Sequence, residues 1–346
     1  MDAPLTLLGQ NLLSPMLLAF CLGIAPLTLL GQNLLSPMLL AFCLGIAAQR
    51  LGSDLRLPEP VHQGLTIYLL LAIGLKGGVA LSASPLAAVI WPLIGSALLG
   101  AAIPLWCYPV LRRLGRFEPA DAAAVAAHYG SVSAVTFVAG LAWLDGAGIV
   151  VEGFMPALLA VMEAPGIAVA VLLGRRAMGG GVGLGALAAE VLAGRSILLL
   201  MGGLIIGALT GERGYAPVSP FFASGFAGAL TLFLLDMGVT AARRFGDLRR
   251  VGTFLVAFAL LAPLANAVLG ALVGRAAGLG EGGIAMLAIL AASASYIAAP
   301  AAVRLALPEA NPAFALTAAL AVTFPFNLAL GLPLYAALAR ALAGGG

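Results

Sequence analysis

The sequence has little charge, little histidine and little cysteine. Asp, Glu, Lys and Arg make up only 9% of its 346 residues, whereas soluble domains carry about 25%. Two histidines, His62 and His128, are too few for a histidine-rich metal site, and the three cysteines show neither metal-ligand spacing nor a disulfide framework. The net charge is only +3. We therefore expect no cofactor and no nucleic-acid partner, and the composition excludes an ordinary soluble domain.

Hydrophobic residues dominate instead, at 62% of the chain with a mean hydropathy of +1.10. Apolar runs near the ~20 residues that a helix needs to cross a bilayer follow one another along the whole length. No polar stretch is longer than the loop at 174–195. The sequence thus predicts an all-α polytopic membrane protein with ten transmembrane helices, at 36–51, 63–82, 87–111, 120–142, 154–174, 195–211, 219–242, 251–275, 282–304 and 312–342.

Basic residues are distributed unevenly between the loops. Twelve arginines lie in the odd-numbered loops, in the groups 50–56, 112–116, 175–195 and 243–250. The opposite side holds only Arg213, Arg275 and Arg340. Cytoplasmic loops carry the excess of Lys and Arg. The odd loops are therefore predicted to be cytoplasmic, and both ends of the ten-helix core are predicted on the outer, periplasmic side.

The chain carries the same polar interruption twice. Ser131-Val-Ser133 and Ser293-Ala-Ser295 stand 162 positions apart in matching apolar surroundings, and the segment 193–222 parallels 34–63. Each half holds five predicted helices, so the second half must enter the membrane upside down. Inverted repeats of this kind are typical of secondary transporters. We predict a first repeat over 25–178 and a second, inverted repeat over 179–346.

The N-terminus contains a perfect tandem copy. Residues 3–24 recur without a single change as residues 25–46. Units of a structural repeat normally diverge, so this is better explained as a recent duplication. The second copy continues into the first core helix, and residues 1–24 are therefore predicted to be a surplus copy.

The two serine motifs predict breaks in helices four and nine. In hydrocarbon, a helix can be interrupted only where it lines a buried polar cavity. A helix that starts at such a break presents free N–H groups and a positive dipole end, which suit a small anion. The alternative is that small residues only allow close helix packing. The candidate substrate-binding residues are Gly130, Ser131, Ser133, Ser293, Ser295 and Tyr296.

A second polar set suggests a cation site. Pro165 and Pro325 lie inside long apolar runs, where each proline frees a backbone carbonyl. Such carbonyls and side-chain oxygens suit Na+. The candidate Na+ ligands are Thr136, Asp236, Thr323 and Asn327. Lys76 and Glu163 are intramembrane ionisable residues and thus candidates for coupling or gating; the alternative is a charge that reaches the interface from near a helix end.

At these positions the chain resembles the SbtA-type sodium-dependent bicarbonate transporters. The blocks AIGLKGGVAL, ASASYIAAPAAVRLALPEANP and VTFPFNLALGLPLY carry the likeness, which covers roughly 34–342. It implies a protein of the bacterial inner membrane that is not an enzyme and couples inward Na+ movement to bicarbonate uptake. It also implies a gate domain (helices one, two, six and seven), a core domain (three to five and eight to ten), a homotrimer and a PII-like cytoplasmic regulator. By the same likeness, bicarbonate would bind at the four serines, and Na+ near Thr323 and Asn327.

Other functions stay open at this point. A sodium/organic-anion symporter of the bile-acid type would share the architecture, and a cation/proton antiporter would depend on Asp236 and Glu163. An intramembrane serine hydrolase using His128 and Ser131 would lack an orienting third group and an evident oxyanion hole. The residues by themselves indicate a secondary transporter for a small anion.

Overall fold

The computed structural model describes residues 33–180, 185, 189 and 193–344, and the surplus copy at 1–24 lies outside this part. The described residues are helical with no β-strand. The main helices are α4 (Pro37–Arg50), α5 (Glu59–Ala83), α6 (Leu86–Arg113), α7 (Pro119–Gly130), α8 (Ala134–Gly146), α9 (Met155–Ala177), α11 (Arg195–Tyr215), α12 (Phe226–Arg244), α13 (Leu248–Ala276), α14 (Glu281–Ala292), α15 (Ala298–Ala306), α16 (Pro312–Thr317), α17 (Phe324–Phe326) and α18 (Leu332–Ala343).

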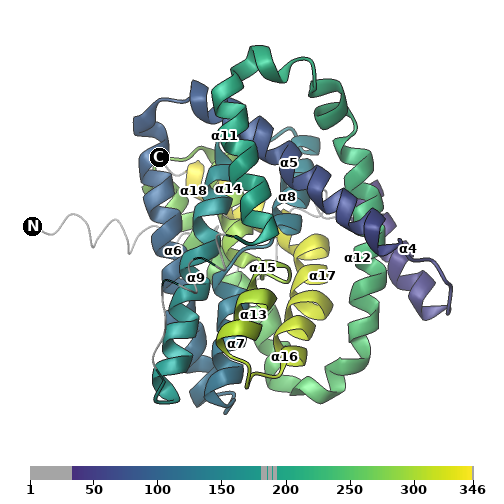
Figure 1. The fold of residues 1–346 in the computed structure, drawn as a ribbon, viewed down its shortest axis with the longest axis vertical. Coiled ribbons are helices and arrows are strands. Elements are labelled where there is room, and N and C mark those ends of the chain that lie inside the picture. Colours follow the sequence, from purple (N-terminus) through teal and green to yellow (C-terminus); the bar gives the residue numbers. More distant parts are fainter. Residues whose placement is uncertain (1–32, 181–184, 186–188, 190–192, 345–346) are drawn as a thin grey trace, which may run out of the picture.

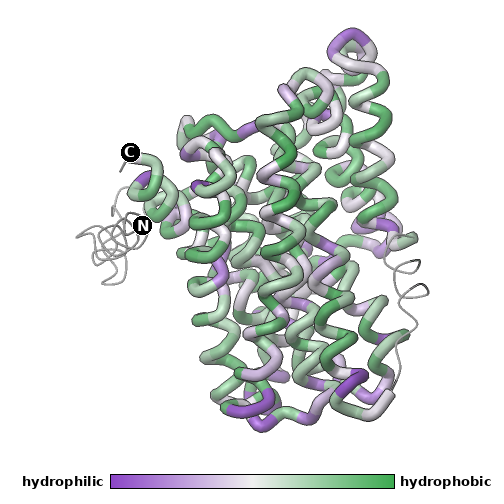
Figure 2. The backbone as a smooth tube through the Cα atoms, turned by 90° about the vertical axis from the view of Figure 1, so that its left-hand side faces the viewer, coloured by the Kyte–Doolittle hydropathy of each residue, from purple (hydrophilic) through white to green (hydrophobic). Residues whose placement is uncertain are grey.

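The helices have the length and composition of membrane spans. Seven helical stretches in the described part are long and apolar enough to cross a bilayer, and α4 and α14 are shorter apolar helices. Figure 2 shows hydrophobic residues along the helices and hydrophilic residues gathered at their ends. Each predicted span contains a helix, although α12 begins at Phe226 because a π-helical turn occupies 220–224. The protein is therefore a multi-pass membrane protein.

Two helix pairs form one part of the molecule. α5 packs along α11, and α4 packs along α12 (Figure 1). Glycines allow both contacts: Gly74 lies against Gly203, and Gly45 lies against the backbone around Gly238. Small residues let membrane helices approach at backbone distance, where van der Waals packing is strongest.

The other part contains the two interrupted spans. α7 ends at Gly130 and α8 starts at Ala134, while α14 ends at Ala292 and α15 starts at Ala298. The predicted breaks are therefore confirmed. α9 and α6 pack against α7, and α13 and α18 pack against α14. The last span, α16 to α18, contains π-helical turns at Ala318–Thr323 and Asn327–Gly331.

Candidate functional site

The two breaks lie against each other. The backbone N–H of Ser133 donates to Oγ of Ser293 over 2.8 Å, and the N–H of Ser295 donates to the carbonyl of His128 over 2.7 Å. Segments far apart in the sequence are thus hydrogen-bonded at the points where their helices stop.

Three of the four predicted serine ligands are already used within the fold. Oγ of Ser133 accepts the N–H of Thr136 (3.1 Å) and so caps α8. Oγ of Ser295 accepts the N–H of Ala299 (3.2 Å), at the start of α15. Oγ of Ser293 donates to the carbonyl of Leu290 (2.7 Å) as well as accepting from Ser133. These hydroxyls satisfy helix ends that would otherwise be open in an apolar environment.

Three other polar atoms at the breaks are buried and have no hydrogen-bond partner among the described residues. They are Oγ of Ser131, Nε2 of His128 and the hydroxyl of Tyr296. His128 Nδ1 lies 2.7 Å from the carbonyl of Ala124, so it carries the hydrogen and leaves Nε2 as an acceptor. A buried polar group without a partner costs free energy. The breaks therefore hold unused hydrogen-bonding capacity, and His128 belongs to the site although it was not among the predicted ligands.

Gly130 has a packing role. A side chain at Gly130 would collide with Pro104 of α6, and one at Gly166 of α9 would collide with the carbonyl of Gly130. The small residue at this position therefore permits close packing of α7 with α6 and α9.

The structure brings two predicted cation ligands to the breaks. Oγ1 of Thr323 donates to the carbonyl of Ala259 (2.7 Å) and therefore accepts the hydroxyl of Tyr129 (2.6 Å), just before the first break. Nδ2 of Asn327 donates to the carbonyl of Ala292 (2.9 Å), the last residue of α14. Oδ1 of Asn327 accepts the hydroxyl of Tyr335 (2.7 Å).

Thr136 joins the same region. It is buried in the first turn of α8, where its N–H is held by Ser133. Thr136, Thr323 and Asn327 are therefore each hydrogen-bonded to a residue at or next to one of the two breaks.

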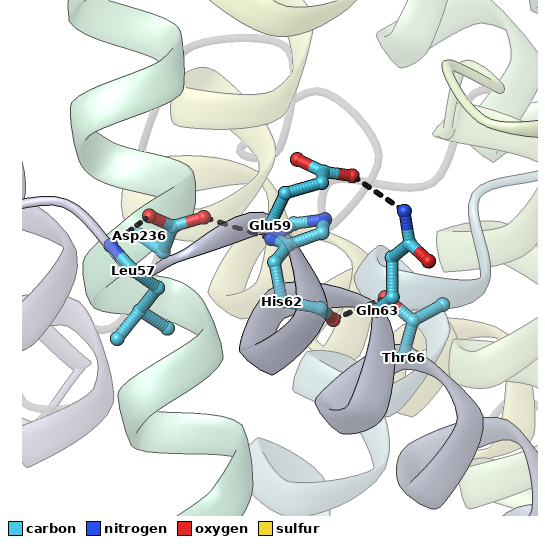
Figure 3. Close-up of polar contacts among 6 residues, drawn as sticks. All are labelled: Leu57, Glu59, His62, Gln63, Thr66 and Asp236. Atoms are coloured by element: carbon cyan, nitrogen blue, oxygen red, sulfur yellow. Dashed lines mark hydrogen bonds and ion pairs between the residues drawn. The ribbon is translucent and has the colours of Figure 1, made fainter.

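Asp236 has a different environment (Figure 3). Its Oδ2 lies 2.8 Å from Nδ1 of His62, and its Oδ1 accepts the N–H of Leu57 over 3.1 Å. Both partners belong to the start of α5 and the segment before it. The structure thus satisfies this carboxylate between α12 and α5 and records no contact between it and the residues of the breaks.

The two candidates for coupling differ in exposure. Lys76 is exposed on α5. Glu163 is buried in α9, with 4% of its surface exposed, and forms no hydrogen bond or ion pair within the described part of the chain. Among the described residues, no cluster of three or more His, Cys, Asp or Glu side chains is placed to hold a metal ion.

The last span carries a contact that the sequence analysis missed. Nδ2 of Asn33, just before α4, donates to the carbonyls of Leu328 (2.7 Å) and Ala329 (2.8 Å). In the π-helical turn Asn327–Gly331, the N–H of Leu332 donates to the carbonyl of Asn327. The next residue, Pro333, has no N–H to donate. The carbonyl of Leu328 therefore has no donor in its own helix. Pro333 was the sequence signal for a free carbonyl at this point.

Comparison with known proteins identifies a family. No curated protein matches the chain. A sequence profile of the Na+-dependent bicarbonate transporter superfamily matches residues 37–340, which include both breaks and every residue described above except Asn33. The chain therefore belongs to the Na+-dependent bicarbonate transporter superfamily.

Proposed function

We propose that this protein is a secondary active transporter that carries bicarbonate into the cell by symport with Na+. The observation that carries the proposal is the group of buried polar atoms on Ser131, His128 and Tyr296 at the joined helix breaks, which have no hydrogen-bond partner within residues 33–180 and 193–344. A site of this kind inside a membrane protein needs a small polar occupant.

Bicarbonate suits these atoms. It offers acceptor oxygens and one O–H donor. The hydroxyls of Ser131 and Tyr296 donate to its oxygens, and Nε2 of His128, fixed as an acceptor, receives its O–H. His128 lies on the last turn of α7, Ser131 directly follows this helix, and Tyr296 follows the residue that bonds to the His128 carbonyl. The N-terminal end of α8 adds a favourable dipole for an anion.

The cation shares this region. Thr136, Thr323 and Asn327 supply hydroxyl and amide oxygens, as a hard cation requires. Asp236 is left out of the Na+ set because its hydrogen bonds go to His62 and Leu57 and not to residues of the breaks, whereas Thr323 and Asn327 bond next to the breaks. Bound Na+ offsets the charge of bicarbonate in a poorly polarisable environment, so each ion strengthens the binding of the other.

Contacts between the halves support ten helices in two inverted repeats. The first helix of each half packs on the second helix of the other, as α4 with α12 and α11 with α5. Glu152 follows the fourth span (α7 and α8) and accepts the N–H of Gly280, at the start of the ninth span (α14 and α15), over 2.7 Å. Conversely, Asn311 follows the ninth span, and its N–H donates to Asp121 at the start of the fourth span over 2.7 Å. An inverted repeat predicts this exchange.

The sidedness and the assembly belong to the same proposal. Each of the last two contacts joins loops that the arginine distribution assigns to one side of the membrane. We place the protein in the bacterial inner membrane with both core termini outside. A homotrimer divided into gate and core domains, with a PII-like protein as cytoplasmic regulator, is the arrangement that the sequence resemblance favours.

The test is uptake of labelled bicarbonate into proteoliposomes under an imposed Na+ gradient, with K+ substitution as the control. We expect Ser131→Ala to weaken bicarbonate uptake about tenfold or more, because a hydrogen bond to a charged ligand is lost. The same variant should keep its melting temperature, since no hydrogen bond of the fold is lost.

Ser133→Ala is the matched variant. Its hydroxyl caps α8, so its loss should lower stability by about 1 kcal/mol. Absence of bicarbonate flux from folded wild-type protein would overturn the proposed substrate.

A further inference from the structure

Glu163 is a buried carboxylate without a partner in the described part of the chain. Among the described residues only two acidic side chains are buried, Glu163 and Asp236. Asp236 bonds to His62 and to the N–H of Leu57, whereas Glu163 bonds to none of the described residues. An unpaired buried carboxylate is strongly disfavoured unless a positive charge or a proton neutralises it.

The packing of α9 places Glu163 beside the first break. Gly174 packs against Ala123 of α7 and near Leu307, which follows α15, while Gly166 packs against Gly130 at the end of α7. α9 and α7 are therefore antiparallel neighbours. Residues three, seven and eleven positions apart lie on one helix face, so Glu163 shares the face of Gly166 and Gly174.

Gly166 lies beside Gly130, where α7 ends. Glu163 lies on the same face of α9, one turn further along the direction from Gly174 to Gly166, which is the direction in which α7 runs. α7 ends at Gly130, and the chain continues beyond it as the extended segment from Ser131 to Ser133. This register places Glu163 at the level of the first break, where Oγ of Ser131 has no partner among the described residues.

We propose that the Glu163 carboxylate is a direct ligand of the transported cation, together with oxygens of the first break. This assignment rests on the proposed Na+-coupled function and names the anionic member of its cation site. A carboxylate, a hydroxyl and freed backbone carbonyls are hard oxygen ligands, and no described Lys or Arg forms an ion pair with Glu163.

The location also sets the order of binding. With the cation absent, a proton neutralises the buried Glu163 carboxyl, and the cation replaces that proton when it binds. This exchange does not involve bicarbonate. Na+ therefore binds before bicarbonate and also in its absence.

This order allows a test that does not depend on transport. The melting temperature of the purified full-length protein is measured without bicarbonate in sodium chloride and in choline chloride. Wild type should melt at a higher temperature in Na+, and Glu163→Gln should lose this difference. Glu212→Gln, the same chemical change at an exposed position of α11, should keep it. A full Na+ shift in Glu163→Gln would overturn the proposal.

A second measurement uses the wild-type protein, in case the variant does not fold. A hydrophobic carbodiimide modifies protonated carboxyls within membranes, and mass spectrometry identifies the modified residue. Glu163 should be labelled in choline and at least tenfold less in Na+. Equal labelling in the two salts would contradict cation binding at Glu163.

The two proposals can fail separately. If wild type takes up no bicarbonate but Na+ still protects Glu163, the substrate is wrong and the cation ligand stands. If uptake is Na+-dependent and Glu163→Gln keeps both the uptake and the Na+ shift, the symport stands and the ligand is wrong.

Discussion

The paired helices and the interrupted helices differ in how their buried polar groups are hydrogen-bonded. In the layer of α4, α5, α11 and α12, the backbones meet at glycines and the buried carboxylate of Asp236 is bonded twice. At the breaks, polar groups on Ser131, His128 and Tyr296 have no bonding partner among the described residues. Unpaired buried groups destabilise a fold. This difference between the regions supports our proposal that the breaks hold an occupant, whereas the helix pairs maintain the structure.

A steric clash beside the first break should reduce the yield of folded protein more than any other change predicted here. Gly166→Leu places a side chain against the carbonyl of Gly130, where only backbone could move. Overpacking at such a contact costs about 1–3 kcal/mol or more, and we expect most of the protein to misfold. Yield of monodisperse protein on size exclusion measures the effect. Gly202→Leu, at a site with open space around it, is the control, and an equal loss of yield in both variants would contradict the packing argument.

The pairing of Asp236 gives a smaller and more specific prediction. His62→Ala removes the 2.8 Å contact and leaves only the Leu57 N–H on the carboxylate. A buried acceptor that loses a partner costs about 1–3 kcal/mol, which a denaturation curve in detergent can measure. Gln63→Ala is the neighbouring control, because its bond to Glu59 is exposed and exposed pairs contribute about 0–1 kcal/mol. Equal losses would mean that the His62 pair is no more important than a surface contact (Figure 3).

Much of this architecture is readable from the sequence, because it depends on local properties. Span positions follow from apolar length, and the breaks follow from serines in otherwise apolar runs, so the interruptions at Ser131–Ser133 and at Ser293 were predicted within a few residues. Thr323 and Asn327 were selected because Pro325 lies beside them in a long apolar run, and their use as cation ligands stays a prediction.

The hydrogen-bond partner of each polar atom could not be predicted, because the partners lie far away in the sequence. The Ser133 N–H finds its acceptor 160 residues away, and Asp236 finds His62 at a separation of 174 residues. Both contacts require the helices to be packed. Nothing in the local pattern distinguishes Asp236, which is paired, from Glu163, which bonds to no residue that the structure describes. Likewise, whether a serine hydroxyl caps a helix or stays free depends on the exact residue at which the helix restarts.

The smallest predicted effect joins the two regions at Asn33. Asn33→Ala removes both donors from the carbonyls of Leu328 and Ala329, and the loss should be about 1 kcal/mol of unfolding free energy. Asn33→Asp should cost more, since it sets a carboxylate against two carbonyls. If Pro333 is the reason that these carbonyls need Asn33, then Pro333→Ala supplies a backbone N–H and should make Asn33→Ala less costly. The double-mutant cycle measures this coupling directly. Additive losses would show that Asn33 acts independently of the proline. The contact would then be one more interaction between the start of α4 and the last span, and not a replacement for the hydrogen bonds that the π-helical turn next to Asn327 lacks.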